Sequence, residues 1–344
     1  MVEVDPADAA AVGGALAEWA SDRFGGAIRL VGPPAALSGG FDSHLHSLQL
    51  AGEALPAAWQ GPLVVRVLPT VDRRAQAERE AAVQAWATEQ GYATATVLAV
   101  LSPEDAVGRP AQVMQRLPGT TLLQAVASRP WQARRQIDRL AHLARRLHAL
   151  PVEGWPGPAA PDALVAQRLH LPRLVVERTG DADLADALRR VDALDPAALV
   201  GGPAVVCHGD FHPLNVMVDG DRAWVLDWTD AALGPPEGDV ARTLLLLGVV
   251  APIAASSAVE RLALRAAGPW LARRYRRAYE GGAPLDPGRL RRWTALHALH
   301  GWAQVVMLHD GGFAGSSSAD GQEDAIPLAL ASVLRARVDA ALAG

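Results

Sequence analysis

The first part of the chain carries short hydrophobic runs separated by residues that favour turns. Three of these runs, at 28–31, 46–50 and 63–67, stand between segments rich in glycine, proline and serine. Two later runs, at 95–101 and 112–117, repeat the pattern. Short apolar runs bounded by turn signals are typical of antiparallel strands. The pattern therefore predicts a small antiparallel sheet.

One charged segment in this region follows a different period. Between residues 72 and 90, small apolar residues and one tryptophan recur at helical spacing among charged ones, which predicts an amphipathic helix. Pro118-Gly119 then breaks the pattern, because both residue types disfavour regular structure. Residues 1–117 are thus predicted to form a small domain with one main helix beside its sheet.

Beyond that break, the hydrophobic positions follow the helical period. In 130–150, one apolar stripe forms while most of the arginines lie elsewhere, which predicts a helix with one face in a core. The other segments predicted to be helical cover 161–195, 256–308 and 326–342. The stretch 311–324 is rich in glycine, serine and aspartate and is predicted to be a loop. Residues 118–344 are therefore predicted to form a larger, mostly helical domain, and the fold class is α+β.

Composition and charge exclude several classes of protein. The chain has 344 residues, of which 50% are hydrophobic and 20% charged, as in globular proteins. The formal net charge of −5 leaves no positive excess to hold a phosphate backbone, so nucleic acid is not expected as a partner. The sequence contains no lysine, so an arginine at a given position says little about a preference for a guanidinium group.

The single cysteine and the longest uncharged run bear on location. Cys207 alone can form no internal disulfide, and a zinc site built on thiolates is excluded. The acidic start of the chain does not resemble a secretory signal. The run 243–259 falls short of the roughly 20 apolar residues that cross a bilayer, so no membrane partner is expected. These features favour a location of the protein in the reducing cytoplasm.

Residues 205–242 carry the most informative chemistry. His208-Gly209-Asp210 is followed by Asn215, a short apolar run, a turn at Asp219-Gly220 and a second apolar run that ends at Asp227. Two apolar runs joined by such a turn predict a tight hairpin. The sequence therefore places two carboxylates and one amide at the ends of that hairpin.

These side chains suit phosphoryl transfer. The charge on a moving phosphoryl group is neutralised by Mg²⁺ while the attacking hydroxyl is held in line, and Mg²⁺ prefers oxygen ligands. Asp227 and the side-chain oxygen of Asn215 can supply such ligands. Asp210 can orient the hydroxyl and accept its proton. The alternative is a solvated acidic turn, a description that fits Asp219 and Asp221.

The two motifs in this region resemble those of a known family. HGDFHPLN, from His208 to Asn215, and VLDWTDA, which contains Asp227, are similar to the catalytic and metal-binding loops of the aminoglycoside phosphotransferase and choline kinase family. The resemblance covers about residues 25–310. It implies a protein-kinase-like, two-lobed fold, with 1–117 as the nucleotide-binding lobe and 118–344 as the catalytic lobe.

The same resemblance implies a role for each motif residue. His208 braces the loop, Asp210 is the catalytic base, and Asn215 and Asp227 are the magnesium ligands. Trp228 stands where a protein kinase carries the Phe of D-F-G, so the small-molecule branch is expected.

Three neighbouring residues admit more than one interpretation. His212 shapes the loop, touches substrate or simply packs. Asp230 is either a second metal-site or substrate carboxylate or a cap of the following turn. Asp239 precedes the apolar helix predicted to begin near Val240 and is expected to stabilise its N-terminus.

The resemblance also implies nucleotide contacts in the first lobe. Ser38-Gly39-Gly40 resembles the loop over the phosphates, since small residues let backbone N–H groups approach closely, although it is not G-x-G-x-x-G. The alternative is a plain Gly-Gly turn between two strands. Arg66 stands at the basic position of the third strand, with Glu80 of the next helix as its partner. The alternative is that both are solvated surface residues. Gln115, Arg116 and Leu117 resemble the hinge that meets the adenine ring.

The implied activity is transfer of phosphate from Mg²⁺-bound ATP, or GTP, to a hydroxyl of an aminoglycoside-like or other small polar compound. The acceptor is expected against the helices of 256–310. The acidic stretch 310–324 either attracts a cationic sugar or is a disordered tether. Two alternatives are a metabolite kinase for choline, a sugar or an amino-alcohol, and a nucleotide-binding protein without transferase activity. Substrate profiling separates them.

Overall fold

The computed structural model describes residues 4–37, 43–250, 258–282, 284–310 and 329–343. The chain divides into two compact units, an N-terminal unit that runs to Pro118 and a C-terminal unit that begins at Gly119. The predicted phosphate loop Ser38-Gly39-Gly40 and the predicted loop 311–324 lie outside the described residues, so both stay predictions.

The N-terminal unit is built on one antiparallel sheet, as the short hydrophobic runs predict. Its strands follow the spatial order β1-β3-β4-β6-β5, with β2 paired to β3. The strand bounds are β1 Arg29–Leu30, β2 Ala35–Leu37, β3 His44–Ala51, β4 Gly61–Val67, β5 Val97–Leu101 and β6 Ala111–Gln115. Short 3-10 turns, η1 Ala57–Trp59 and η2 Val71–Arg73, stand at either end of β4.

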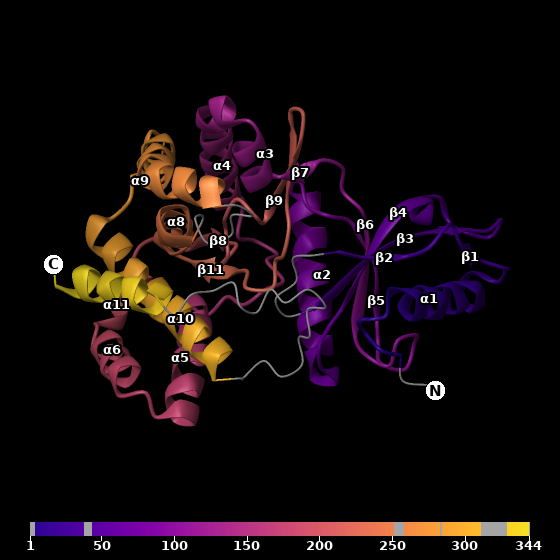
Figure 1. The fold of residues 1–344 in the computed structure, drawn as a ribbon, viewed down its shortest axis with the longest axis horizontal. Helices are drawn as coiled ribbons and strands as arrows, with labels where there is room; N and C mark the ends of the chain where they lie inside the picture. Colours follow the sequence, from indigo (N-terminus) through magenta and orange to yellow (C-terminus); the bar gives the residue numbers. More distant parts are fainter. Residues whose placement is uncertain (1–3, 38–42, 251–257, 283, 311–328, 344) are drawn as a thin grey trace. The chain divides into compact units, whose positions relative to one another are not determined.

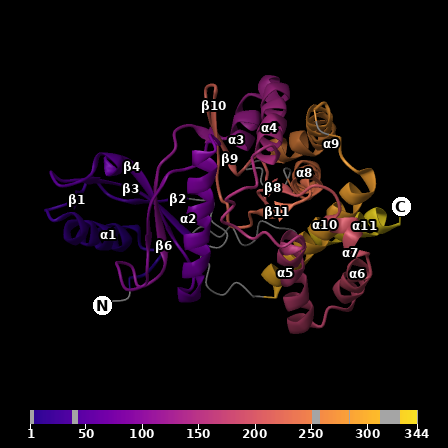
Figure 2. The ribbon, with the colours of Figure 1, turned by 180° about the vertical axis from the view of Figure 1, so that it is seen from behind.

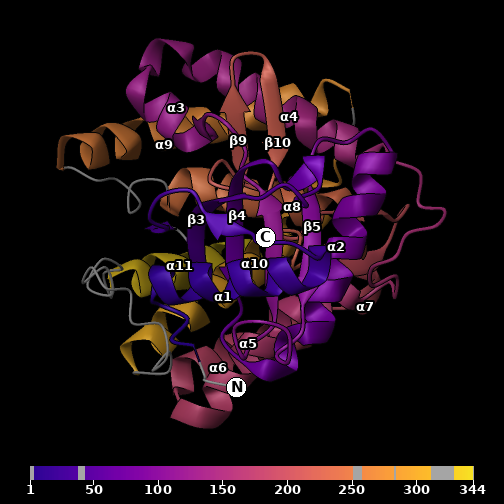
Figure 3. The ribbon, with the colours of Figure 1, turned by 90° about the vertical axis from the view of Figure 1, so that its right-hand side faces the viewer.

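Two helices cover opposite faces of this sheet (Figure 1). Helix α1, Ala9–Phe24, packs on β1 and β3, and helix α2, Arg74–Glu89, packs on β5 and β6. Figure 3 shows α1 crossing the strands. The alternation of side chains along β4 decides which of them lie on each face of the sheet, because successive residues point to opposite sides. Leu63, Val65 and Val67 therefore join the core under α1, while Arg66 points to α2.

The prediction of one main helix in this unit is wrong, since α1 is a second helix of equal length. Gly13 and Gly14 lower the helical propensity of the segment and blur its periodicity. The capping signals at its ends are clear: the Asp8 side chain accepts from two backbone N–H groups, and Gly25 adopts φ of 75° as the C-cap. These signals could have located the helix.

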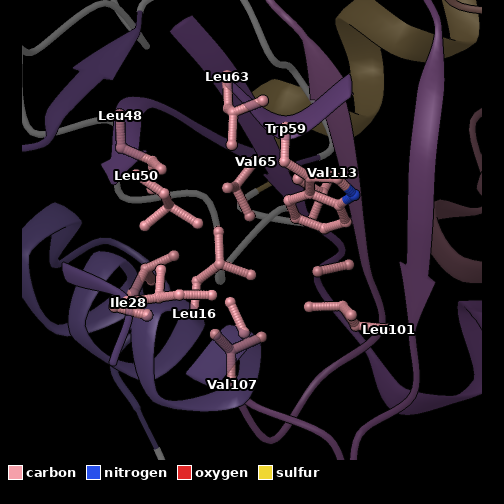
Figure 4. Close-up of a cluster of buried hydrophobic side chains, with 14 of the residues drawn as sticks. Leu16, Ile28, Leu48, Leu50, Trp59, Leu63, Val65, Leu101, Val107 and Val113 are labelled. Atoms are coloured by element: carbon pink, nitrogen blue, oxygen red, sulfur yellow. The ribbon is translucent and has the colours of Figure 1, made fainter. Parts of the chain in front are cut away.

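The core of the N-terminal unit lies between α1 and the sheet (Figure 4). Leu16 of α1 meets Leu50, Val65 and Val113 from three neighbouring strands, and each is at most 2% exposed. Full burial of such a side chain contributes about 1.5–3 kcal/mol. This packing holds β4 in place, and with it the side chain that points to α2.

The C-terminal unit is mostly helical, as predicted (Figure 2). Its helices are α3 Leu122–Ser128, α4 Ala133–His148, α5 Ala163–Thr179, α6 Ala182–Asp192, α7 Pro196–Val200, α8 Pro236–Leu245, α9 Ala258–Glu280, α10 Pro287–His309 and α11 Ala329–Leu342. A 3-10 turn, η3 Pro130–Gln132, precedes α4, and a π-helical turn, η4 Leu246–Val250, follows α8. Its strands are β7 Thr120–Thr121, β8 Val205–Cys207, β9 Val216–Asp219, β10 Arg222–Val225 and β11 Ala232–Gly234.

Helix α10 is the centre of this unit. It packs against α5, α8 and α11, and Trp293, Leu296 and Leu299 on it are fully buried. The hairpin of β9 and β10 joins β7 in a three-stranded sheet, and β9 packs against α3 (Figure 3). Strands β8 and β11 pair separately beside α8 and α5. In the described part of the chain, no helix is both long and apolar enough to cross a membrane.

Candidate active site

The predicted hairpin forms from β9 and β10. Val216 pairs with Val225 and Asp219 with Arg222, which leaves a two-residue turn. Gly220 opens that turn with φ of 56°, a conformation that hairpin turns require and glycine adopts at low cost. At the other end, the backbone N–H of Leu226 donates to the carbonyl of Asn215 at 2.8 Å. The residue after Leu226 is Asp227, so the amide and the carboxylate stand at the same open end.

Asp227 has an unusual backbone. Its φ of 58° is the only positive value among the described residues that are not glycine. Such conformations cost about 1–3 kcal/mol and persist where surrounding structure enforces them, often at functional sites. Its Oδ1 accepts a hydrogen bond from the Thr229 hydroxyl at 2.8 Å.

Asp210 is held by charged and polar groups on both oxygens. The Arg242 Nε donates to Oδ1 at 2.7 Å, and the His212 Nε2 lies 3.1 Å from Oδ2. The Asn215 Nδ2 donates to the Asp210 carbonyl at 3.0 Å. Asp210 and Asn215 are therefore in contact, and His212 touches the carboxylate. Arg242, on α8, was not predicted from the sequence.

The electrostatic surroundings keep Asp210 ionised. Burial by itself raises the pKa of this carboxyl, but the positive charge of Arg242 and the contact with His212 outweigh that effect, and Arg168 adds to them. The pKa of Asp210 is therefore held well below its usual range. The side chain remains 24% exposed, so a ligand can reach it.

Asp239 fastens the loop that carries Asp210. Its two carboxylate oxygens accept the backbone N–H groups of His208 and Gly209, each at 2.7 Å, and the side chain is fully buried. The His148 Nε2 lies 3.1 Å from the same carboxylate. Asp239 stands in the first turn of α8, as expected for an acidic residue at a helix N-terminus, and its carboxylate also holds a loop about 30 positions away.

His208 connects this loop to the end of the hairpin. The Asp210 backbone N–H donates to its Nδ1 at 3.3 Å, so Nε2 carries the proton and donates to the Leu226 carbonyl at 2.8 Å. The ring packs against Trp228 with centroids 5.1 Å apart. The imidazole is fully buried, so its contacts are internal to the site.

Gly209 and Asp230 bring the two motifs into direct contact. Gly209 has φ of 79°, and a Cβ there would overlap the Asp230 carbonyl, so only glycine fits. The Asp230 carboxylate forms an ion pair with Arg168 of α5, whose side chain is 3% exposed. Neither interpretation of Asp230 from the sequence included this pair. Arg168 carries no local signal that could have revealed it.

In the N-terminal unit, the predicted pairing of Arg66 with Glu80 is confirmed. The Arg66 Nη1 donates to both carboxylate oxygens, at 2.9 and 3.0 Å. The side chains are 11% and 2% exposed, which rules out the alternative of two solvated surface residues. The Arg66 Nε also donates to the Ser43 hydroxyl at 3.1 Å. A role of this pair in nucleotide binding stays a prediction.

The predicted hinge residues are partly occupied by contacts within the same unit. The Gln115 N–H donates to the Thr96 carbonyl at 3.0 Å, and the Arg116 N–H donates to the Pro62 carbonyl at 3.0 Å. These two amides are therefore used in the sheet. A contact of Gln115, Arg116 or Leu117 with a base stays a prediction. Such a contact would have to use the backbone carbonyl groups of Gln115 and Arg116, or Leu117.

One cluster with metal-ligating side chains occurs among the described residues, namely His148, Cys207 and Asp239. Its atoms already have partners: the His148 Nδ1 lies 2.7 Å from the Tyr279 hydroxyl, and the Cys207 thiol donates to the Pro235 carbonyl at 3.4 Å. Burial raises the pKa of the Cys207 thiol, and the charge of Asp239 raises it further. The cluster is a hydrogen-bonded support, and the oxygen donors suited to Mg²⁺ stand at the hairpin.

Comparisons with known proteins place these features in a family. Residues 56–293 match the sequence model described as the phosphotransferase enzyme family. An aminoglycoside 3'-phosphotransferase from Streptomyces fradiae is 38% identical over 94 residues, covering 24% of this chain and 32% of that protein. The chain thus spans about a third of the length of this curated relative.

Solved structures agree with the fold. A thermostable mutant of the aminoglycoside phosphotransferase APH(4)-Ia, in ternary complex with ADP and hygromycin B, is 17% identical with a TM-score of 0.61, covering 96% of this chain and 98% of that chain. The macrolide 2'-phosphotransferase MphH from Brachybacterium faecium is 19% identical with a TM-score of 0.53, covering 94% of this chain and 98% of that chain. The predicted α+β, protein-kinase-like fold is confirmed. Because the family model covers more than half of its residues, the chain belongs to the phosphotransferase enzyme family.

Proposed function

We propose that the protein transfers the γ-phosphoryl group of Mg²⁺-bound ATP to a hydroxyl of a small polar compound. One observation carries the proposal: an ionised, partly exposed Asp210 stands against Asn215 at the open end of the hairpin that Asp227 follows. Phosphoryl transfer requires an orienting carboxylate beside oxygen ligands for a divalent cation.

The donor atoms at the hairpin fit Mg²⁺. Asn215 uses its Nδ2 to donate to Asp210, so its amide oxygen is the end left for a cation. Asp227 adds a carboxylate on a backbone held in a costly conformation. Both are hard oxygen ligands of the kind Mg²⁺ prefers. When bound there, Mg²⁺ would neutralise charge on the phosphate oxygens.

Asp210 acts mainly by position in this proposal. A carboxylate whose pKa lies well below its usual range is a weak base, so it cannot remove the proton of a hydroxyl in advance. It can hold that hydroxyl in line for attack, since orientation alone lowers barriers substantially. It accepts the proton as the new P–O bond forms and the hydroxyl becomes acidic. Arg242 and His212 fix the carboxylate for this task.

The nucleotide contact that we propose in the N-terminal unit is Arg66. Its guanidinium is oriented by Glu80 and Ser43, and guanidinium groups bind phosphate oxygens through charge-assisted hydrogen bonds. ATP is the first nucleotide to test, and GTP is the alternative. Because these nucleotides are cytoplasmic metabolites, we propose that the protein acts in the cytoplasm.

The acceptor that we propose is an aminoglycoside-like compound. The proposal rests on the curated relative, an aminoglycoside 3'-phosphotransferase, and on the solved structure that contains hygromycin B. Macrolides belong in the same panel because MphH is a macrolide 2'-phosphotransferase. Choline, sugars and amino-alcohols complete this panel of acceptors.

The deciding experiment measures transfer of labelled γ-phosphate from ATP, and separately from GTP, to each member of this panel. Asp210→Asn should lower turnover on the active acceptor by about 10²- to 10⁴-fold and leave nucleotide affinity nearly intact. Asp219→Asn is the matched control, because Asp219 is an exposed turn residue paired with Arg222. Nucleotide binding without transfer to any acceptor would support a binding protein instead.

A further inference from the structure

A positively charged hollow lies between two helices of the C-terminal unit, α4 and α9. These helices pack side by side (Figures 1 and 2). The hollow has a volume of about 290 Å³. Its lining side chains are Arg134 from α4 and Trp270, Arg273, Arg274 and Arg277 from α9. Four of the five are therefore guanidinium groups.

The charge in this hollow is only partly compensated. Arg274 is paired with Asp138, its Nε lying 2.6 Å from the carboxylate. Arg134, Arg273 and Arg277 have no ion pair with any carboxylate of the described residues. Four positive charges thus face one negative charge in a protein whose formal net charge is −5.

Neighbouring arginines on the same helices behave differently. Arg276, on α9, pairs with Glu280 at 2.9 Å. Arg135, on α4, pairs with Asp221 of the hairpin turn. Among the described residues, three guanidinium groups of the hollow thus have no carboxylate partner, whereas Arg276 and Arg135 beside it do. The absence of lysine does not change this contrast, because the number and placement of positive charges define it.

The lining also offers a flat aromatic surface. Trp270 is 44% exposed, which is unusual for a large aromatic side chain and leaves ring area for contact. Aromatic rings stack on planar ligands and on guanidinium groups. Guanidinium groups bind phosphate by paired, charge-assisted hydrogen bonds. The combination of ring and arginines suits a ligand that has both a phosphate group and a ring.

We propose that this hollow binds a phosphorylated small molecule. Arg134, Arg273 and Arg277 hold its phosphate, and Trp270 contacts its ring. The volume is at the lower end of the range for ligand pockets, roughly 300 Å³ and upward. A concave site of this size favours a small ligand over the extended surface of a nucleic acid or an acidic protein.

The hollow is lined by side chains of other elements than those that hold Asp210. The groups that hold Asp210 come from α8 and from its own loop, whereas the hollow is formed by α4 and α9. A cationic aminoglycoside would also be repelled by an excess of positive charge. The site therefore does not depend on the proposed kinase activity, and a negative result for one leaves the other standing.

The test is calorimetric titration of the full chain with inorganic pyrophosphate, without divalent cations so that Mg²⁺-dependent binding elsewhere is suppressed. We expect one equivalent to bind, more weakly as salt rises. The double variant Arg273→Ala/Arg277→Ala should bind at least about tenfold more weakly, as loss of charge-assisted hydrogen bonds to phosphate implies. Arg276→Ala is the matched control on the same helix and should bind like the unmodified protein.

The ring contact has its own test. Phenyl phosphate should bind more tightly than inorganic phosphate, and Trp270→Ala should remove that advantage while pyrophosphate binding persists. Arg134→Ala, on the other helix, provides a second variant at an exposed position, and melting temperatures verify that each variant is folded. Absence of pyrophosphate binding, or equal binding by the double variant, overturns the proposal. Binding only to vesicles that contain phosphoinositides would assign the surface to a membrane headgroup and overturn it as well.

Discussion

Replacing Arg242 by methionine removes the positive charge nearest to Asp210 and keeps most of the side-chain volume. The Arg242 Nε lies 2.7 Å from Asp210 Oδ1, and the arginine side chain is 9% exposed. Two unit charges at about 4 Å interact by about 4 kcal/mol at an effective dielectric constant of about 20. Because Asp210 is 24% exposed, water screens part of this interaction, and about 2 kcal/mol is a reasonable expectation.

That free energy favours the ionised form of Asp210 over the protonated form. The substitution should therefore raise the pKa of the Asp210 carboxyl, because it removes the positive charge that most favours the ionised form. Burial, which itself raises the pKa, would then be opposed mainly by His212. In the unmodified protein the pKa is below its unfolded value, so Asp210 stabilises the fold above about pH 4 and this stabilisation is lost as the pH falls further. In Arg242→Met the stabilisation should be smaller.

Two measurements check this reasoning. Urea unfolding at pH 7 should show a loss of about 2 kcal/mol, and the difference from the unmodified protein should shrink at acid pH as Asp210 becomes protonated in both proteins. The acidic limb in the turnover of the acceptor found in the panel should lie at higher pH in the variant than in the unmodified protein. The control is Arg222→Met, since Arg222 is 69% exposed and its pair with Asp219 is worth at most about 1 kcal/mol. Identical stabilities and pH profiles for the two variants would refute the assignment of Arg242 as the group that sets the charge of Asp210.

Three further substitutions test the support of the site. Asp239→Asn weakens the acceptor of two backbone N–H groups, so urea unfolding should show a loss of about 2–4 kcal/mol; a loss under 0.5 kcal/mol would contradict the role given to the carboxylate. Gly209→Ala places a Cβ against the Asp230 carbonyl at positive φ and should cost at least about 2 kcal/mol in the same assay, whereas a neutral result would mean that the loop moves freely. Asp227→Asn keeps a residue type that tolerates positive φ, so the melting temperature without ligand should hardly change. The increase in melting temperature that Mg²⁺ and ATP cause should disappear. If that increase is retained, Asp227 is not a metal ligand.

The sequence by itself determined the features that depend on consecutive residues. The β9–β10 hairpin follows from two apolar runs around Asp219-Gly220, because a turn of this type and the alternation beside it are local properties. The pairing of Arg66 with Glu80 was also expected, because the resemblance to the aminoglycoside phosphotransferase and choline kinase family implies it. Helix α1 is the local element that was missed, because its glycines obscured a pattern that its caps still mark.

Only the tertiary structure decided how the candidate site is held together. Arg242 meets Asp210 from 32 positions away, and Arg168 reaches Asp230 across 62. A single sequence contains no signal for such pairs, because arginines and aspartates occur throughout the chain and each could pair with many others. The choice is made when α5 and α8 pack on α10. That packing brings a few charges together in surroundings of low dielectric constant, where leaving a charge unpaired costs several kcal/mol.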